Sequence, residues 1–376
     1  MTTVFLRQLN FYDASSVLSA LRALVDAMGG MGQFVSPGER VLLKPNLLSA
    51  EPPDRCVTTH PEIVRAVARL VLEAGGRPFI ADSPGLDRFA HVAAKTGMSD
   101  VARELGIPCE ELTDPEPLSM AEGSLFHRVE VARQALLADK IINLPKLKTH
   151  AQMVLTLGVK NLFGTVVRQR KAEWHYNVGL DRGRFADLHL DIARSLRPAL
   201  TILDGVEGME GRGPGNGTPR HFGLLAAATD PLALDAAVAG LLGLATDDVP
   251  LLRAAKRRGV LPEHALAGDS PDAFAEAMRD VHIPALDSLH LIPRGLRWMG
   301  GSLLASRPRQ NRETCIRCGK CVAICPAKAM TLEGDGRIVI DYGRCIRCYC
   351  CQEVCPANAI DFSKGLILRA LDLLRR

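Results

Sequence analysis

The sequence predicts an α/β domain with a mainly parallel sheet and flanking helices, followed by a small C-terminal α+β module. The chain has 376 residues, which is too long for one simple core. Residues 1–285 alternate short β-rich apolar runs with amphipathic helical segments, as α/β domains do. Nine of the eleven cysteines lie between Cys315 and Cys355, so the end of the chain differs in kind from the rest.

Helices and strands are expected to alternate along the first part. Asp13 is placed to cap a helix that stops at Gly29 and Gly30. Pro61 is placed to begin a second helix. The apolar runs predict at least five strands, over residues 41–44, 78–81, 140–144, 201–203 and 223–227.

The pattern weakens after residue 285, where prolines, glycines and arginines interrupt it. The expected organisation is an α/β domain at residues 1–285, a linker at 286–310, the cysteine module at 311–363 and an amphipathic helix at 364–376.

Composition narrows the classes of function. Apolar residues make up 47% and charged residues 23%, which is typical of a globular protein. Aromatic residues make up only 5% and the formal net charge is +4, which argues against a nucleic-acid binder. The start has no signal-peptide pattern, and the longest apolar stretch is broken by Asp230, Pro231 and Asp235, so neither secretion nor an integral membrane segment is expected. We expect a cytoplasmic protein whose cysteines bind metal rather than form disulfides.

The cysteine module contains one motif twice. The pattern C-x2-C-x2-C-x3-C-P recurs thirty residues later, and IRCGKCVAICPAKAM aligns with IRCYCCQEVCPANAI without a gap. The first run contains Cys315, Cys318, Cys321 and Cys325, and the second contains Cys345, Cys348, Cys351 and Cys355. Two aligned copies indicate an internal duplication of one small unit.

This spacing is typical of bacterial ferredoxins with two 4Fe-4S clusters, in which the last cysteine of each run binds the other run's cluster. The sequence therefore predicts one cluster on Cys315, Cys318, Cys321 and Cys355, and a second on Cys345, Cys348, Cys351 and Cys325. Zinc is the alternative, but zinc sites usually combine two CxxC pairs rather than a run of three plus one. Pro326 and Pro356 are expected to turn the chain after the crossing ligands.

The charge around the module fits this assignment. Residues 305–376 contain 13 Lys and Arg against 7 Asp and Glu, whereas the remainder contains 33 against 35. Oxidised clusters with four thiolates are anionic and favour basic surroundings, although each basic residue alone is equally well explained as a solvated loop charge. Cys350 is left over and is expected to be a spare thiol, while Cys56 and Cys109 are expected to be ordinary buried thiols.

Polar residues follow several apolar runs of the α/β domain. Ligands of open α/β sheets bind beyond the carboxyl ends of the strands, so these positions are the candidate site. We predict catalytic roles for Lys146, Lys148 and His150, and substrate binding by Lys44, Asn46, Asp82, Ser83, Lys160 and Asn161. Lysines gathered at one edge favour an anionic ligand such as a carboxylate or phosphate ester, and His150 or a desolvated lysine could supply a proton.

Each of these residues also has a structural interpretation. A lysine just after a strand is most often solvated, and Asp82 could cap a turn. Asp204, Glu207 and Glu210 follow another strand and are expected either to pair with the lysines or to bind metal. The glycine-rich stretch at 211–217 resembles a mobile flap and matches no nucleotide-binding motif.

Five blocks of the chain resemble a known family. VLLKPNLLS, TTHPEIVRAV, IADSPG, INLPKLKTHAQMVLTLGVKNLFG and LDGVEGMEGRGPGNG, in this order, are similar to the family called domain of unknown function 362, over roughly residues 38–242. Members similar to this chain often end in a two-cluster ferredoxin domain. The resemblance implies an iron-sulfur protein and does not define a substrate.

Two functions remain open at this stage. The first is an oxidoreductase in which two 4Fe-4S clusters pass low-potential electrons to an anionic small molecule held in the α/β domain. The second is a non-enzymatic electron carrier or assembly factor whose α/β domain docks a partner protein. A redox partner protein is expected in either case. A weaker third idea is attachment to a membrane surface through residues 294–304 or the C-terminal helix.

Overall fold

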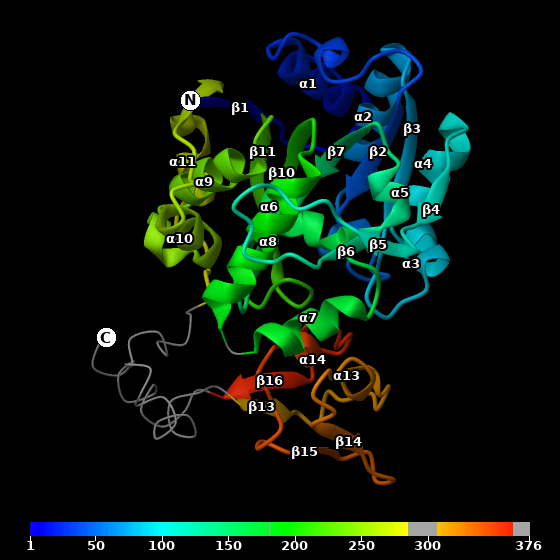
Figure 1. The fold of residues 1–376 in the computed structure, drawn as a ribbon, viewed down its shortest axis with the longest axis vertical. Coiled ribbons are helices and arrows are strands. Elements are labelled where there is room, and N and C mark those ends of the chain that lie inside the picture. Colours follow the sequence, from blue (N-terminus) through cyan, green and yellow to red (C-terminus); the bar gives the residue numbers. More distant parts are fainter. Residues whose placement is uncertain (180, 285–306, 364–376) are drawn as a thin grey trace.

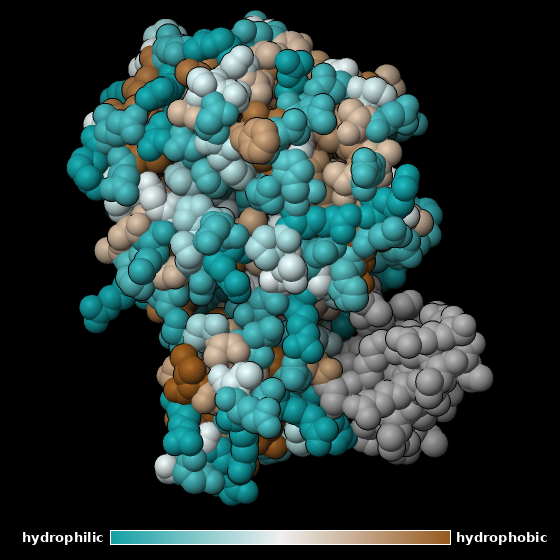
Figure 2. All heavy atoms as spheres, turned by 180° about the vertical axis from the view of Figure 1, so that it is seen from behind, coloured by the Kyte–Doolittle hydropathy of each residue, from teal (hydrophilic) through white to brown (hydrophobic). Residues whose placement is uncertain are grey.

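The computed structural model describes residues 1–179, 181–284 and 307–363. A large body contains the N-terminal residues and a smaller one contains the cysteines (Figure 1). Seen from behind, the surface narrows where the two bodies meet, and hydrophilic side chains cover most of this face (Figure 2). The predicted linker, apart from residues 307–310, and the predicted C-terminal helix lie outside the described residues, as do residues 294–304.

The large body is built on one mixed sheet, which has ten strands within the described residues. Its main path runs β12-β1-β11-β10-β7-β2-β3-β4, and β8 pairs with β10 and β9. The strands are β1 (Thr2–Gln8), β2 (Arg40–Pro45), β3 (Arg77–Asp82), β4 (Cys109–Glu111), β7 (Lys140–Leu144), β8 (Lys146–His150), β9 (Val154–Thr156), β10 (Leu200–Glu210), β11 (Thr218–Ala228) and β12 (His264–Gly268).

Most of these strands are parallel, as predicted. β10, β7, β2, β3 and β4 form a continuous parallel series. β11 pairs antiparallel with both β10 and β1, and the short strand β9 pairs antiparallel with β8. The short segment between β10 and β11 allows a hairpin, whereas a parallel neighbour would need a crossover connection of a dozen or more residues.

Helices cover both faces of the sheet, because successive strand residues point to opposite sides. Leu42 of β2 packs in one core, while Val41 and Leu43 pack in the other. The second core is covered by α1 (Ala14–Asp26), α2 (Pro61–Glu73), α3 (Phe89–Lys95) and α4 (Met98–Leu105). The first core is covered by α6 (Gly158–Asn161), α8 (Arg182–Leu196), α9 (Pro231–Leu241) and α10 (Pro250–Arg257).

The remaining elements of the large body are short. They are β5 (Pro115–Pro117), β6 (Glu130–Ala132), α5 (Arg133–Leu136), α7 (Arg170–Val178), α11 (Ala275–Met278) and 3-10 turns at Met31–Gln33, Pro53–Arg55, Leu162–Thr165, Thr246–Asp248 and Pro271–Phe274. Of these, α7 lies next to the smaller body (Figure 1).

The smaller body repeats one unit, as the sequence indicates. Its elements are β13 (Arg307–Gln310), α13 (Lys320–Ala323), β14 (Met330–Leu332), β15 (Ile338–Ile340), α14 (Cys350–Glu353) and β16 (Ile360–Ser363). The one-turn helices α13 and α14 occupy equivalent positions thirty residues apart. β14 and β15 form a hairpin around residues 334–336, and β13 pairs antiparallel with β16.

Local signals placed the first helices well. The Asp13 side chain accepts a hydrogen bond from the backbone N–H of Ser16 at 2.9 Å and caps α1. Helix α2 begins at Pro61, with His60 as its N-cap. Asp230 accepts a hydrogen bond from the N–H of Leu232 at 2.7 Å and caps the start of α9.

Asp235 joins α9 to the start of α6. Its two carboxyl oxygens accept hydrogen bonds from the backbone N–H groups of Gly158 at 2.7 Å and Val159 at 3.1 Å. All three residues are buried. Since unpaired buried donors cost about 1–3 kcal/mol each, this carboxyl group holds α6 in place.

We expect Asp235→Ala to lower the free energy of unfolding by about 2–4 kcal/mol, because two buried N–H groups would lose their acceptor. Asp230→Asn is the matched control in the same helix, since Asn caps about as well as Asp, and its effect should be a few tenths of a kcal/mol. Urea unfolding followed by far-ultraviolet circular dichroism measures both. Equal destabilisation by the two variants would contradict this role of Asp235.

Candidate functional site

The eight motif cysteines surround two separate cavities in the smaller body. Cys315, Cys318, Cys321 and Cys355 line one cavity. Cys325, Cys345, Cys348 and Cys351 line the other, which Cys350 also touches. Each cavity has an empty volume of about 330 Å³. The fourth cysteine of each run therefore lies with the first three of the opposite run, as the crossed arrangement requires.

These residues fit 4Fe-4S clusters. Each cavity presents four thiols within an otherwise mostly apolar lining, and all eleven cysteines are free of disulfides. The two halves differ in exposure: Cys318 is exposed, whereas Cys348 and Cys351 are buried. A bound cluster supplies one-electron transfer, and the exposed side is where electrons can enter or leave.

The smaller body docks on the carboxyl-end side of the large sheet through several polar contacts. Lys320 forms an ion pair with Asp87 at 2.7 Å, and Arg212 forms one with Asp361 at 2.5 Å. The Asn216 amide donates to the backbone oxygen of Gln352 at 2.7 Å.

Two of these contacts come from the glycine-rich stretch predicted to be a mobile flap, which the structure places against the module. Gly215 lies so close that a Cβ there would be 2.9 Å from the backbone oxygen of Glu353. A side chain at this position would push the two bodies apart.

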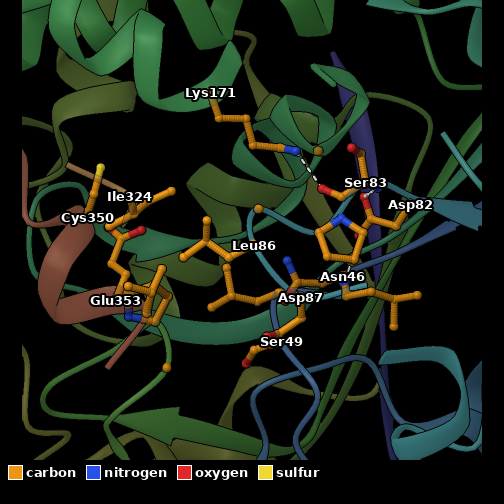
Figure 3. A pocket seen from close by; sticks show the side chains of 18 of the residues that line it. Asn46, Ser49, Asp82, Ser83, Leu86, Asp87, Lys171, Ile324, Cys350 and Glu353 are labelled. Atoms are coloured by element: carbon orange, nitrogen blue, oxygen red, sulfur yellow. Dashed lines mark hydrogen bonds between the residues drawn. The ribbon is translucent and has the colours of Figure 1, made fainter. Parts of the chain in front are cut away.

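A large pocket lies between the two bodies, with an empty volume of about 1500 Å³ including space open to solvent. Figure 3 shows Lys171, Ser83 and Asp82 on one side, with Ile324, Cys350 and Glu353 across from them and Leu86 between. Six residues predicted from the sequence line it, namely Asn46, Asp82, Ser83, Lys148, Lys160 and Asn161. Lys44, Lys146 and His150 do not line the pocket, although they are as fully buried as Lys148.

Lys44 at the end of β2 is neutralised by Asp82 at the end of β3. Their ion pair measures 2.8 Å, and Lys44 also donates to the backbone oxygen of Pro45 at 2.8 Å. Burial lowers the pKa of Lys44, and Asp82 opposes that shift. A Cβ on Gly164 would be 2.5 Å from Lys44 Nζ, so only glycine fits against this pair. Lys44 thus acts as a structural partner of Asp82, which faces the pocket.

Lys146 belongs to a second buried network. Its ammonium group lies 2.9 Å from Asp204 and 2.9 Å from the Tyr12 hydroxyl, which donates to Asp204 at 2.6 Å. The Tyr12 ring stacks on His60 at 3.6 Å between centroids. Burial raises the pKa of Tyr12, and the nearby Asp204 raises it further. This closed network joins the N-terminal segment to β8 and β10.

Lys148 has oxygens around it but no carboxylate partner among the described residues. It donates to Asn46 Oδ1 at 2.7 Å and to the backbone oxygen of Val57 at 2.6 Å. Burial lowers its pKa to about 7, and the positive charges of Lys160 and Lys146 contribute. Lys148 is therefore poised to exchange a proton near neutral pH.

His150 faces the module rather than the pocket. Its Nδ1 accepts hydrogen bonds from the backbone N–H groups of Gln152 at 3.0 Å and Met153 at 3.3 Å. A neutral His150 must then carry its proton on Nε2, which lies 3.3 Å from Glu353 Oε1. Burial holds the pKa of His150 well below its usual range.

Asn161 and Lys160 reach the site from α6. Asn161 donates to Asn143 at 2.8 Å and accepts from Asn46 at 3.1 Å, so it orients the amide that receives Lys148. Burial lowers the pKa of Lys160, against the opposing charge of Glu353.

Several pocket residues escaped sequence reasoning. Lys171 donates to the backbone oxygen of Ser83, and burial lowers its pKa to about 7. His175 is buried with a pKa lowered to about 3, and both residues lie on α7. Their spacing on one helix is the only local signal. Glu353 comes from the cysteine module, and no local pattern could have linked it to the lysines.

The three acids that were expected to follow a strand lie within β10 itself and have separate partners. Asp204 binds Lys146, Glu207 lies 2.7 Å from His221, and Glu210 pairs with Arg220 at 3.1 Å. Across the described ranges, no group of three or more His, Cys, Asp or Glu side chains is arranged to hold a single metal ion.

Comparisons with known proteins agree with this architecture. A 4Fe-4S dicluster domain model matches residues 314–359. The thylakoid-associated protein sll1697 of Synechocystis sp. is 45% identical over 251 residues, which cover 67% of this chain and 78% of that protein.

One solved structure is a more distant match. The lactate racemase apoprotein of Thermoanaerobacterium thermosaccharolyticum has a TM-score of 0.39 and 13% identity over 61% of this chain. The match spans 55% of the racemase chain, and a likeness this remote does not bear on activity.

The family model described as domain of unknown function (DUF362) matches residues 41–240, which hold β2 to α9 and the large-body side of the pocket. Together with the 45% identical relative, this match shows that the chain belongs to the DUF362 family, with a 4Fe-4S dicluster domain at residues 314–359.

Proposed function

We propose that this protein relays low-potential electrons through two 4Fe-4S clusters to a small anionic molecule bound between its two bodies. The observation that carries the proposal is a shared wall. Cys355 lines both the first cysteine cavity and the interdomain pocket, and Cys350 lines both the second cavity and that pocket. An acceptor in the pocket would thus be separated from each cluster by little more than one cysteine.

The anionic character of the acceptor follows from the pocket's charges. Lys148, Lys160 and Lys171 line it, and none forms an ion pair with a carboxylate in the described part of the chain. Buried cations are normally paired, so a bound anion would complete the site. Lys148 and Lys171, whose pKa values burial lowers to about 7, would donate protons to a reduced acceptor.

A partner protein would deliver the electrons at the exposed side of the module. The Ile316 side chain is 64% exposed and Cys318 is exposed, and both line the first cavity. A redox partner can approach this cavity without entering the pocket.

The location of the protein in the cell is also a proposal. No helix within the described residues is long and apolar enough to cross a membrane. We propose a cytoplasmic protein, and the relative's thylakoid association is a reason to examine its distribution directly.

Two double variants test the number of clusters and their crossed ligands. In protein reconstituted without oxygen we expect about eight irons per chain. Cys315→Ala with Cys355→Ala removes two ligands of one cluster, so about four irons should remain. Cys321→Ala with Cys325→Ala removes one ligand from each cluster, so most iron should be lost. Iron and sulfide quantification with EPR measures both.

The two double variants are each other's control, because each removes two cysteines. If each run bound its own cluster, Cys315→Ala with Cys355→Ala would damage both clusters, and Cys321→Ala with Cys325→Ala only one. That reversed result would overturn the crossed assignment. Stoichiometric zinc in place of iron would overturn the electron-relay proposal itself.

Electron delivery into the pocket is tested by filling it. Reduced holoprotein is mixed anaerobically with carboxylates and phosphate esters, and cluster reoxidation is followed by absorbance. We expect Leu86→Trp to slow reoxidation by every active compound at least about tenfold, since Leu86 lies in the middle of the pocket wall.

Ferricyanide is the control oxidant, because it can react at the exposed side of the module, and its rate should not change in Leu86→Trp. Equal rates for an active compound in both proteins would show that the pocket is not its site. If no compound in such a panel reoxidises the clusters, the non-enzymatic carrier function is favoured instead.

A further inference from the structure

We propose that the interdomain pocket selects a dianion with an apolar body, either a dicarboxylate or a phosphate monoester, and that both bodies of the protein form the site. This inference rests on the proposed function and names the class of its substrate. It goes beyond a general preference for anions, because it assigns the number of charges on the ligand and its amphipathic shape.

The number of charges follows from the lysines that the fold leaves uncompensated. Lys44 is neutralised by Asp82, Lys320 by Asp87 and Arg168 by Glu111. The ammonium groups of Lys148, Lys160 and Lys171 remain at the pocket wall.

Glu353 is the carboxyl group that lines the same pocket, and its Oε1 lies 3.3 Å from His150 Nε2. Three ammonium groups and one carboxylate thus share this part of the pocket, which leaves two positive charges unmatched when the lysines are protonated. A ligand with two negative charges would balance them. Glu51 also lines the pocket but is partly exposed, so solvent screens it.

Two of the lysines are fixed by hydrogen bonds to different segments of the chain, which favours a ligand that reaches more than one of them. Lys171 is fixed by its bond to the backbone oxygen of Ser83 after β3, and Lys148 by Asn46 and Val57. Lys160 lines the same pocket, where the charge of Glu353 from the module opposes the lowering of its pKa by burial.

The apolar residues that line the pocket indicate that the ligand has an apolar body. Leu86, Ile324 and Val354 line the same pocket, and Ile324 and Val354 belong to the cysteine module. Figure 3 shows Ile324 beside Cys350, with Leu86 between this side and Lys171. A ligand with its charges on the lysines would place its uncharged part against this wall, next to Cys350. Such a site needs both bodies, because each supplies one wall.

Three compounds built on one ring test the inference by isothermal titration calorimetry on anaerobic holoprotein. Benzoate carries one charge, whereas terephthalate and phenyl phosphate are dianions of the two chemistries. We expect at least one dianion to bind about tenfold or more tightly than benzoate, because an added charge-assisted contact is worth that much. Whichever dianion binds more tightly shows whether the site prefers a dicarboxylate or a phosphate monoester. Inorganic phosphate, which lacks the ring, shows how much the ring adds to the affinity.

Lysine variants locate the site. Lys160→Met and Lys171→Met should each weaken the preferred dianion about tenfold and benzoate less. Lys256→Met, an exposed lysine on α10 paired with Asp247, is the matched control and should leave binding unchanged. Iron content and circular dichroism confirm that each variant is folded. Equal affinity for all three ring compounds, no binding of either dianion, or unchanged dianion binding in both pocket variants would overturn the inference.

The affinity should also depend on pH, and terephthalate is the suitable probe because it stays doubly charged above pH 6. Burial lowers the pKa of Lys148 and Lys171 to about 7, so these groups are protonated below that pH and lose their charge above it. We expect terephthalate affinity to fall as pH rises from 6.5 to 8.5. The charged groups facing these two lysines are Lys44, Asp82, Glu111, Lys146, Lys160, Arg168 and Glu353.

These measurements separate the inference from the function on which it rests. If the protein prefers dianions but holds far fewer than eight irons, the result supports the ligand site and contradicts the electron relay. Pocket-dependent reoxidation by monoanions, without any dianion preference, would keep the relay and overturn the inference alone.

Discussion

The burial of ammonium groups at the carboxyl ends of the sheet strands constrains the rest of the structure. A buried charge costs several kcal/mol unless oxygen atoms surround it, and removing one member of a buried pair costs about 3–5 kcal/mol. Lys44 and Lys146 each receive a carboxylate, from Asp82 and Asp204 on neighbouring strands. These pairs fix how β2, β3, β8 and β10 meet and leave Lys148 with neutral oxygens only. The pocket's positive charge is thus what remains after the fold has neutralised its own lysines.

The module completes this charge balance and gives the site its two-body character. Glu353 stands on α14, between the cysteines at 351 and 355, and meets His150 at the end of β8. The same one-turn helix carries Cys350, which touches both a cysteine cavity and the pocket. In the proposed function this short helix would have three roles, since it carries the predicted cluster ligand Cys351, contacts the end of β8 and lines the pocket. Close packing of Gly215 against this helix leaves little freedom for the two bodies to separate.

Sequence reasoning succeeded where the determining interactions are local. The cysteine spacing, the Asp13 cap and the Pro61 helix start all depend on residues a few positions apart, and the structure contains each. The mainly parallel sheet followed from the alternation of strands and helices. The antiparallel placement of β11 did not follow from this alternation. The extra strand β8 did not follow either, because the polar run at 146–150 lacks the apolar composition of a strand. Its side chains are buried by pairing with oxygens from other segments, which no local pattern records.

The candidate site shows the same limit more sharply. Nine residues were selected because they follow strands, and six of them line the pocket. The position of a lysine relative to a strand could not show that Lys148 lines the pocket and Lys146 does not. The two lysines differ because the carboxylate of Asp204, far away in the sequence, pairs with Lys146. Lys171 and Glu353 were missed because one lies on a helix and the other in the module. A strand end predicts where a ligand binds, but the charge of that ligand depends on which lysines the remaining fold fails to neutralise, and this is a property of the assembled chain alone.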